Sequence, residues 1–308
     1  SRVDGLEARL NNFEAGSFSS TTSASFSVDM AIGAVESSAV TEAISAVYGY
    51  QIDLSSSFTG EDTLAVAIDA GSGQSSLAEL DLNTTNNDAL TVDGVTYTFP
   101  VGDKLTLLVG DSTSGSALFS TACVYGGFTN TLDDCGNAMS AITATAHATL
   151  VTGTVGFSAA YDIGNGFTGA FGYNGQGSDA AGLATNEALD FYAAQLTYTA
   201  DNYGASVTYA NLDAATAIGL NGYYAFASNL PSISVGYEFG DFENQTIGNV
   251  VSTETETTQW FVGLQWDELG NGTLGVAMGS RGPQLEDTDE NMAYEAVSYT
   301  HLRAHETV

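Results

Sequence analysis

Apolar and polar residues alternate one by one along much of the chain, beginning near Phe18. In the first half, the alternation is clearest over residues 26–32, 44–55 and 63–69. A period of two places successive side chains on opposite faces of an extended backbone. Each of these runs therefore predicts a β-strand that has one apolar face and one polar face.

In the second half the alternating runs come in pairs that are separated by short turns. Such turns include Gly164-Asn165-Gly166 and Asp201-Asn202, which are residue types that tight hairpin turns require. We therefore predict antiparallel hairpins, and about 14 to 15 strands in all. The runs of this half are residues 157–161 and 167–173, 192–198 and 203–209, 233–239, and 260–266 and 274–278.

Two all-β architectures fit this pattern, a soluble sandwich or solenoid and a transmembrane barrel. Several runs reach about nine residues, the length a tilted membrane strand needs, and the polar face is made of Ser, Gly, Ala and Thr. No apolar run approaches the roughly 20 residues of a membrane helix. Aromatic residues gather near the ends of the runs, as in interfacial girdles. We therefore predict an antiparallel transmembrane β-barrel over residues 17–297. The aromatic residues are Tyr48, Tyr50, Tyr161, Phe167, Tyr198, Tyr203, Trp260 and Trp266.

The two ends of the chain differ from its middle. In residues 1–16, Val3, Leu6, Leu10 and Phe13 have the spacing of a heptad seam, which predicts the end of a short coiled-coil helix or a plain amphipathic helix. Residues 298–308 look like a non-native tail, to which we assign no function. We expect the chain to be a piece of a longer protein, in which the tail stands in place of a final strand.

The charge of the chain is strongly negative, with 37 acidic residues against 5 basic ones. Nucleic acid is excluded as a partner because it requires clustered Lys and Arg. Two interpretations remain: an acidic surface solvated in a salty medium, and an acidic lumen that enriches cations. The alternation places five acids on the small-residue face, and these are the candidates for lining a pore. They are Asp29, Asp53, Asp69, Glu238 and Asp267.

The only two cysteines, Cys123 and Cys135, lie close together in a loop-like segment. We predict that they form a local disulfide outside the cytosol. A zinc site is the alternative, but no histidine lies nearby in the sequence to complete one.

Catalysis and tight metal binding have weaker support. The acidic stretches at Glu61-Asp62, Asp133-Asp134 and 286–290 could hold Ca²⁺ or Mg²⁺ weakly in loops, yet none has the spacing of a known calcium motif. His147 beside a serine is the only enzymatic arrangement worth naming, and a lone histidine in a strand is usually structural. We expect no cofactor and no enzymatic activity.

Several longer strings resemble cyanobacterial outer-membrane porins of the carbohydrate-selective porin superfamily, in particular the marine picocyanobacterial type. In those proteins an S-layer-homology domain and a coiled coil precede the barrel. The resemblance covers about residues 3–297. The strings are LEARLNNFEAGSFSSTT at 6–22, VDGVTYTFPVGDKLT at 92–106, TACVYGGFTNTLDDCGNA at 121–138, DNYGASVTYAN at 201–211, PSISVGYEFGD at 231–241 and WFVGLQWDELGNGTLG at 260–275.

The resemblance implies a homotrimer of barrels with about 16 strands each, embedded in the lipid of a bacterial outer membrane. Such a protein passes small hydrophilic solutes and inorganic ions by diffusion, and relatives are described as carbohydrate-selective or iron-uptake porins. Contact with peptidoglycan would require the domain upstream of Ser1. We expect the cysteine segment, with Asp133 and Asp134, to help shape the constriction of the pore. The alternative function is a secreted, acidic, β-rich calcium-binding surface or adhesion module.

Overall fold

The computed structural model describes most of the strand-forming sequence. Within the described residues every regular element is a β-strand, as the alternation predicts. The predicted coiled coil over 1–16 lies outside them. The described residues are 22–33, 44–72, 88–120, 122–126, 132, 155–175, 182–185, 190–212, 215–226, 230–242, 246–247, 250–251, 256–269, 272–280, 284–285, 289 and 291–300.

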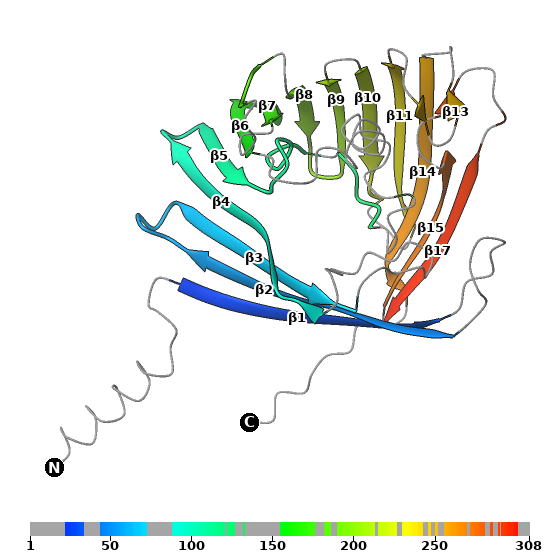
Figure 1. Cartoon of the computed structure of the whole chain (residues 1–308). Coiled ribbons are helices and arrows are strands. Elements are labelled where there is room, and N and C mark those ends of the chain that lie inside the picture. The colour runs from blue at the N-terminus through cyan, green and yellow to red at the C-terminus, as the bar shows by residue number, and fades with distance from the viewer. Residues whose placement is uncertain are drawn as a thin grey trace. The chain divides into compact units, whose positions relative to one another are not determined.

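The chain divides into two compact units, and the first comprises residues 1–78 and 82–113. Its five described strands pair antiparallel in chain order (Figure 1). A register shift between Ala67 and Ile68 is the one irregularity among these pairings. The strands are β1 (Thr22–Gly33), β2 (Ser45–Ser56), β3 (Thr63–Gly71), β4 (Thr91–Val101) and β5 (Leu105–Asp111).

The turn between β2 and β3 is organised around the buried carboxylate of Asp62. Its Oδ1 accepts hydrogen bonds from the backbone N–H of Phe58 (3.0 Å), the backbone N–H of Thr59 (2.7 Å) and the hydroxyl groups of Ser57 (2.8 Å) and Thr59 (2.7 Å). The Tyr97 hydroxyl of β4 donates to Oδ2 at 2.7 Å. Burial acts to raise the pKa of Asp62, but these hydrogen bonds outweigh it and hold the pKa well below its ordinary value. The oxygens of Asp62 therefore have a structural role, in place of the calcium ligation considered for Glu61-Asp62.

We expect Asp62→Asn to destabilise the folded protein at pH 7. Because the pKa of Asp62 is depressed by folding, its contribution is complete above the ordinary carboxyl pKa of about 4 and is lost as the pH falls below that value. The urea midpoint of the protein refolded in detergent should thus be lower for Asp62→Asn at pH 7, and the gap should narrow toward pH 2. The exposed neighbour provides the control, and Glu61→Gln should leave the midpoint unchanged. A gap independent of pH would contradict this role of the carboxylate.

The second unit comprises residues 79–81 and 114–308. Its long described strands lie in the order β6-β7-β8-β9-β10-β11-β14-β15-β17, and neighbours pair antiparallel (Figure 1). They are β6 (Val155–Gly164), β7 (Phe167–Gly175), β8 (Asp190–Thr199), β9 (Tyr203–Leu212), β10 (Ala215–Tyr224), β11 (Ser232–Phe242), β14 (Glu256–Leu269), β15 (Gly272–Ser280) and β17 (Met292–Thr300). The short strands are β12 (Thr246–Ile247), β13 (Val250–Val251), which pairs with β12, and β16 (Gln284–Leu285), which pairs with β14.

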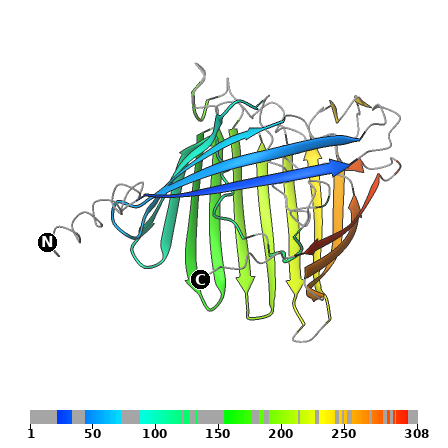
Figure 2. The ribbon, with the colours of Figure 1, turned by 90° about the horizontal axis from the view of Figure 1, so that it is seen from below.

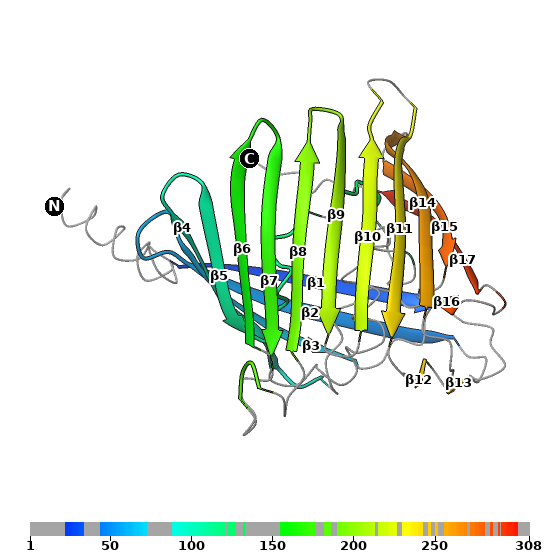
Figure 3. The same cartoon turned by 90° about the horizontal axis from the view of Figure 1, so that it is seen from above.

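The predicted hairpins are present. The hairpins β6–β7, β8–β9 and β10–β11 close at the same end of the second unit (Figure 3). In the first of these turns Gly164, Asn165 and Gly166 all have positive φ, at 99°, 56° and 84°. Gly and Asn tolerate this left-handed backbone better than other residues do, which is why this triplet marked the turn in the sequence.

The last described strand extends beyond the expected end of the native sequence. β17 runs to Thr300, and Ser298, Tyr299 and Thr300 pair with Leu274, Thr273 and Gly272 of β15. The first three residues of the predicted tail 298–308 are thus part of a strand, and residues 301–308 lie outside the described part. Among the described residues, no helix has the length and apolar character to cross a membrane.

Candidate functional site: a polar sheet face and its inner loop

The strands of the second unit bury their polar face and expose their apolar face. In β8, Gln195 is 5 % exposed and Thr197 is 2 % exposed, whereas Leu196 between them is 45 % exposed. A soluble sheet has the reverse arrangement, with the apolar side chains covered and the polar ones in water. The exposed side of this sheet therefore requires an apolar environment.

The same inversion continues across the neighbouring strands. Thr208 of β9 and Glu238 of β11 are buried, while Val207, Leu220 and Tyr237 are between 40 % and 47 % exposed. One continuous row on the polar face runs through directly paired residues of five strands. This row consists of Gln195, Thr208, Gly219, Glu238 and Gln259.

A segment that follows β5 lies along the polar face, and we name residues 114–120 and 122–126 the inner loop. It crosses the strands of the second unit as a teal trace (Figure 2). Its backbone N–H groups donate to side chains of β6 and β8. Leu118 donates to Ser158 Oγ (3.3 Å) and Ser120 to Gln195 Oε1 (2.8 Å). The loop thus meets its hydrogen-bonding needs on the sheet.

The far end of the inner loop is anchored in the same way. The Val124 and Tyr125 N–H groups donate to Ser234 Oγ at 3.1 and 3.2 Å. The next N–H, of Gly126, donates to Gln265 Oε1 at 2.8 Å. The Tyr125 hydroxyl donates to Glu295 Oε1 of β17 at 2.7 Å. The inner loop therefore spans from β6 to β17 on the polar face.

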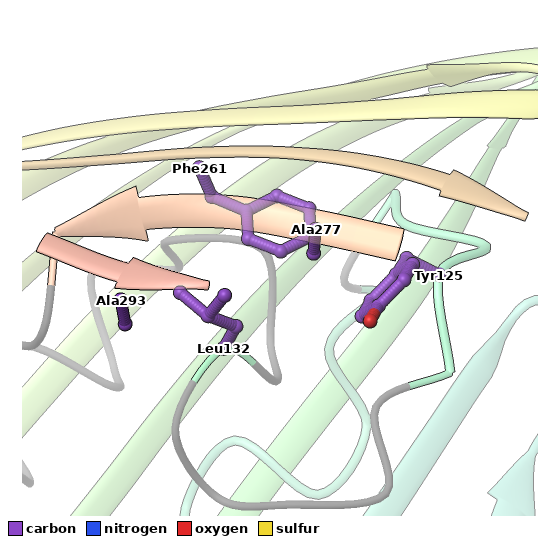
Figure 4. Close-up of a cluster of buried hydrophobic side chains, with 5 residues drawn as sticks. All are labelled: Tyr125, Leu132, Phe261, Ala277 and Ala293. Atoms are coloured by element: carbon purple, nitrogen blue, oxygen red, sulfur yellow. The ribbon is translucent and has the colours of Figure 1, made fainter. Parts of the chain in front are cut away.

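A small apolar cluster fixes this end of the loop to the sheet. Tyr125 and Leu132 pack against Phe261 of β14, Ala277 of β15 and Ala293 of β17 (Figure 4). The rings of Tyr125 and Phe261 have centroids 5.4 Å apart in a tilted arrangement. Burial of these side chains supplies the hydrophobic part of the loop's attachment.

At the start of the inner loop, the backbone of the loop lies close to the backbone of β7. A Cβ added to Gly172 of β7 would overlap the carbonyl group of Gly115, and one added to Gly115 would lie 2.6 Å from the Tyr173 carbonyl oxygen. The Gly115 N–H also donates to Asn174 Oδ1. Glycine at both positions is therefore required for the loop to lie against β7.

Cys123 of the inner loop is disulfide-bonded, and the described part of the chain contains no free cysteine. Its expected partner, Cys135, lies outside the described residues, as do Asp133, Asp134 and His147. The pairing of the two cysteines and the role of the acidic pair in a constriction therefore stay predictions.

The acids predicted for the small-residue face of the second unit are Glu238 and Asp267. Glu238 is 1 % exposed, and no described residue provides a hydrogen bond to its Oε2. Asp267 is exposed, and its Oδ1 accepts a hydrogen bond of 2.6 Å from Gln265, the residue that also accepts from Gly126. Asp267 is thus linked to the inner loop through Gln265, whereas Glu238 is buried on the polar face of the sheet.

The three acids predicted in the first unit share one face of its sheet. Asp29 pairs with Gly49, Gln51 pairs with Asp69, and Asp53 pairs with Ala67, so their side chains project to the same side. Asp53 accepts from Gln51 Nε2 at 2.7 Å. Asp69 is 4 % exposed, while Asp29 is exposed. That these acids line a pore stays a prediction.

The residues that hold the inner loop were not among the predicted site residues. Ser158, Gln195, Ser234 and Gln265 are small or polar members of the face that the alternation identified. Nothing in the sequence distinguishes them from their neighbours, because each bonds to a loop residue that is 40 to 139 positions away in the chain. Within the described part, no group of three or more His, Cys, Asp and Glu side chains is arranged to hold a metal ion.

Comparison with known proteins gives structural likeness only. No protein-family model matches the chain, and no curated protein does. A loop-deletion variant of OmpT, an outer membrane protein of Vibrio cholerae, is similar over 91 % of this chain and 99 % of its own, with 11 % identity and a TM-score of 0.49. A variant of the Rh. blastica porin is similar over 91 % and 100 %, with 12 % identity and a TM-score of 0.44. OpdL of Pseudomonas aeruginosa is similar over 88 % and 68 %, with 13 % identity and a TM-score of 0.44. All three TM-scores are below 0.5, so the fold rests on the strand pairing and exposure described above.

Proposed function

We propose that this protein is a bacterial outer-membrane porin, a transmembrane β-barrel through which small hydrophilic solutes and inorganic ions diffuse. The observation that carries the proposal is the inverted exposure of the second unit, in which Leu196, Leu220 and Tyr237 face outward while Gln195, Thr208 and Glu238 are covered. A strand can cross a bilayer only when its backbone is paired and its outward side chains are apolar.

The polar face and its inner loop would then form the wall and the narrow part of the channel. The loop is attached through its backbone and through the Tyr125 side chain, which leaves exposed residues such as Ala117 and Ser120, and the acid beside the loop, Asp267, to meet the solutes. A peptide loop attached across the inside of a wall narrows the path, so solutes would be sorted by size there. No step of this mechanism involves a covalent change in the solute.

The finer features of the proposal rest on the sequence. A homotrimer is supported by the heptad spacing of Val3, Leu6, Leu10 and Phe13, and a carbohydrate-selective or iron-uptake type by the resemblance to cyanobacterial porins. Crosslinking in membranes should show trimers. Replacement of both cysteines by serine should change the conductance if the disulfide shapes the constriction.

The test of the proposed function is single-channel recording with the full chain in a planar bilayer. Stable, ohmic current steps are expected. A protein that remains in solution without detergent, gives no current and responds to chelators would contradict the porin and favour the secreted calcium-binding module.

Cation preference is a separate prediction. Because acids on the inner face outnumber the described bases, the reversal potential in a KCl gradient should have the sign of a K⁺-selective pore. Asp29→Asn/Asp53→Asn/Asp267→Asn should move it toward zero, since it removes three of the charges predicted to meet the ions. The control Asp201→Asn, in the β8–β9 turn, should not. An anion-selective sign in the unchanged protein would refute the acidic-lumen hypothesis.

A further inference from the structure

The exposed face of the second unit is hollowed at one edge by a groove of about 400 Å³. It lies over the ends of β9 and β11 and over the beginnings of β10 and β14. These strand ends are at the lower edge of the sheet in Figure 3. Its volume is within the range of small-molecule sites. Its lining includes residues of four adjacent strands, so its shape is set by the sheet itself.

The floor of the groove is apolar and belongs to the outward face. Ile218 pairs with Tyr209 on one side and with Phe239 on the other. Tyr209 is 47 % exposed and Phe239 is 42 % exposed. These side chains present aliphatic and aromatic surface to whatever surrounds the sheet, which in the proposed porin is the hydrocarbon near the membrane interface.

The end of the groove carries two negative charges. Asp241 of β11 and Glu256 of β14 are direct cross-strand partners, and both line the groove and are exposed. Within the described part of the chain, neither carboxylate has a hydrogen bond or an ion pair. Like charges placed directly opposite each other repel, so the pair favours a positively charged group between them.

We propose that this groove binds a membrane lipid whose headgroup ends in a primary ammonium. One acyl chain would lie over Tyr209, Ile218 and Phe239, and the ammonium would donate hydrogen bonds to Asp241 and Glu256. A primary ammonium has three N–H donors on one centre and can serve both carboxylates together. The inference rests on the proposed function, because it requires the apolar face to be in a membrane.

The negative charge of the groove disfavours a second copy of this chain or an anionic lipid as its occupant. The described residues of the second unit contain no Lys or Arg, so a second copy of this face would bring four carboxylates together without a described base to neutralise them. An anionic lipid would be repelled in the same way. A choline headgroup is cationic but has no N–H to donate, and so should bind less well than an ethanolamine headgroup.

The test uses the full chain exposed to an equimolar mixture of dioleoyl phosphatidylethanolamine, phosphatidylcholine and phosphatidylglycerol. After a detergent wash, native mass spectrometry counts the lipids that remain bound. Ethanolamine lipid should be retained in preference to both others. The preference should fall about fivefold in Asp241→Asn/Glu256→Gln, the size that two solvent-exposed charge pairs provide together. Equal retention of the three lipids, or an unchanged preference in the double variant, would overturn the inference.

Two further variants test the acidic end and the apolar floor of the groove separately. Asp201→Asn removes an exposed acid at the opposite end of β9 and should keep the full preference. Ile218→Trp fills the floor and should reduce retention of every lipid. Retention of phosphatidylglycerol that depends on Mg²⁺ and is abolished by EDTA would show a metal-bridged anionic lipid and would also overturn the inference.

Bilayer recording distinguishes a failure here from a failure of the proposed function. The conductance of Asp241→Asn/Glu256→Gln should equal that of the unchanged protein, because the groove is on the face away from the inner loop. Normal channels without an ethanolamine preference would overturn the lipid site alone. Absence of channels from the unchanged protein would contradict the porin itself.

Discussion

Leu220→Arg is expected to destabilise the protein in lipid by about 2–4 kcal/mol, the cost of an arginine near the middle of a bilayer-facing strand. Leu220 lies midway along β10, is 47 % exposed, and has Val207 and Tyr237 as its outward cross-strand partners. In water the same substitution at an exposed site would change stability by no more than about 0.5 kcal/mol. The size of the destabilisation therefore indicates whether hydrocarbon or water surrounds this face of the sheet.

The measurement is reversible urea unfolding of the chain folded into phospholipid vesicles. Thr199→Arg is the control, because Thr199 is exposed at the end of β8 and lies on the polar side of that strand, where an arginine should not meet hydrocarbon. If both arginine variants were as stable as the unchanged protein, the apolar face would not be in hydrocarbon and the porin proposal would fail.

The second large effect is expected from the variant Gln195→Ala/Ser234→Ala/Gln265→Ala. These three side chains accept hydrogen bonds from the N–H groups of Ser120, Val124, Tyr125 and Gly126. Loss of three such anchors at about 1 kcal/mol each would raise the ratio of detached to attached inner loop on the order of a hundredfold. A detached loop no longer narrows the path, so the single-channel conductance should increase and become noisier.

Ser206→Ala tests whether the effect is specific to the inner loop. Ser206 is buried on the same polar face, but its hydroxyl bonds to Asn221 and to no described residue of the loop. The conductance of Ser206→Ala should therefore equal that of the unchanged protein. An unaltered conductance in the triple variant, with the strands intact by circular dichroism, would show that the loop does not limit the current.

The strands could be predicted because their signal is local. The alternating runs named from the sequence fall in strands, for example 26–32 in β1, 192–198 in β8 and 233–239 in β11, except that Ile44 of the run 44–55 precedes β2. Among the long strands, β4, β5, β10 and β17 were not named from an alternating run. In β10 small residues such as Ala217 and Gly219 stand beside Ile218 and Leu220, which weakens the contrast between the two faces.

The role of Asp62 shows where residue-level interpretation fails. The acidic pair in a loop suggested solvated charge, with weak calcium binding as the alternative because loop carboxylates are typical calcium ligands. The turn instead supplies Asp62 with donors from Ser57, Phe58 and Thr59, and the fold brings Tyr97 to it from 35 residues away. The local donors could have been suspected from the spacing, but the tyrosine could not.

The sequence by itself determined most of the long strands, which side of each of those strands is apolar, and where their hairpins turn, because each depends on neighbours within a few positions. It also placed Asp29, Asp53 and Asp69 on a common face, since a period of two preserves the side of each residue when the register holds. Only the tertiary structure decided that the polar face is the covered one, that the inner loop lies on it, and that Asp241 and Glu256 meet at the edge of a groove. These features join residues far apart in the chain, and their contacts depend on the strand register across many strands, which no local pattern encodes.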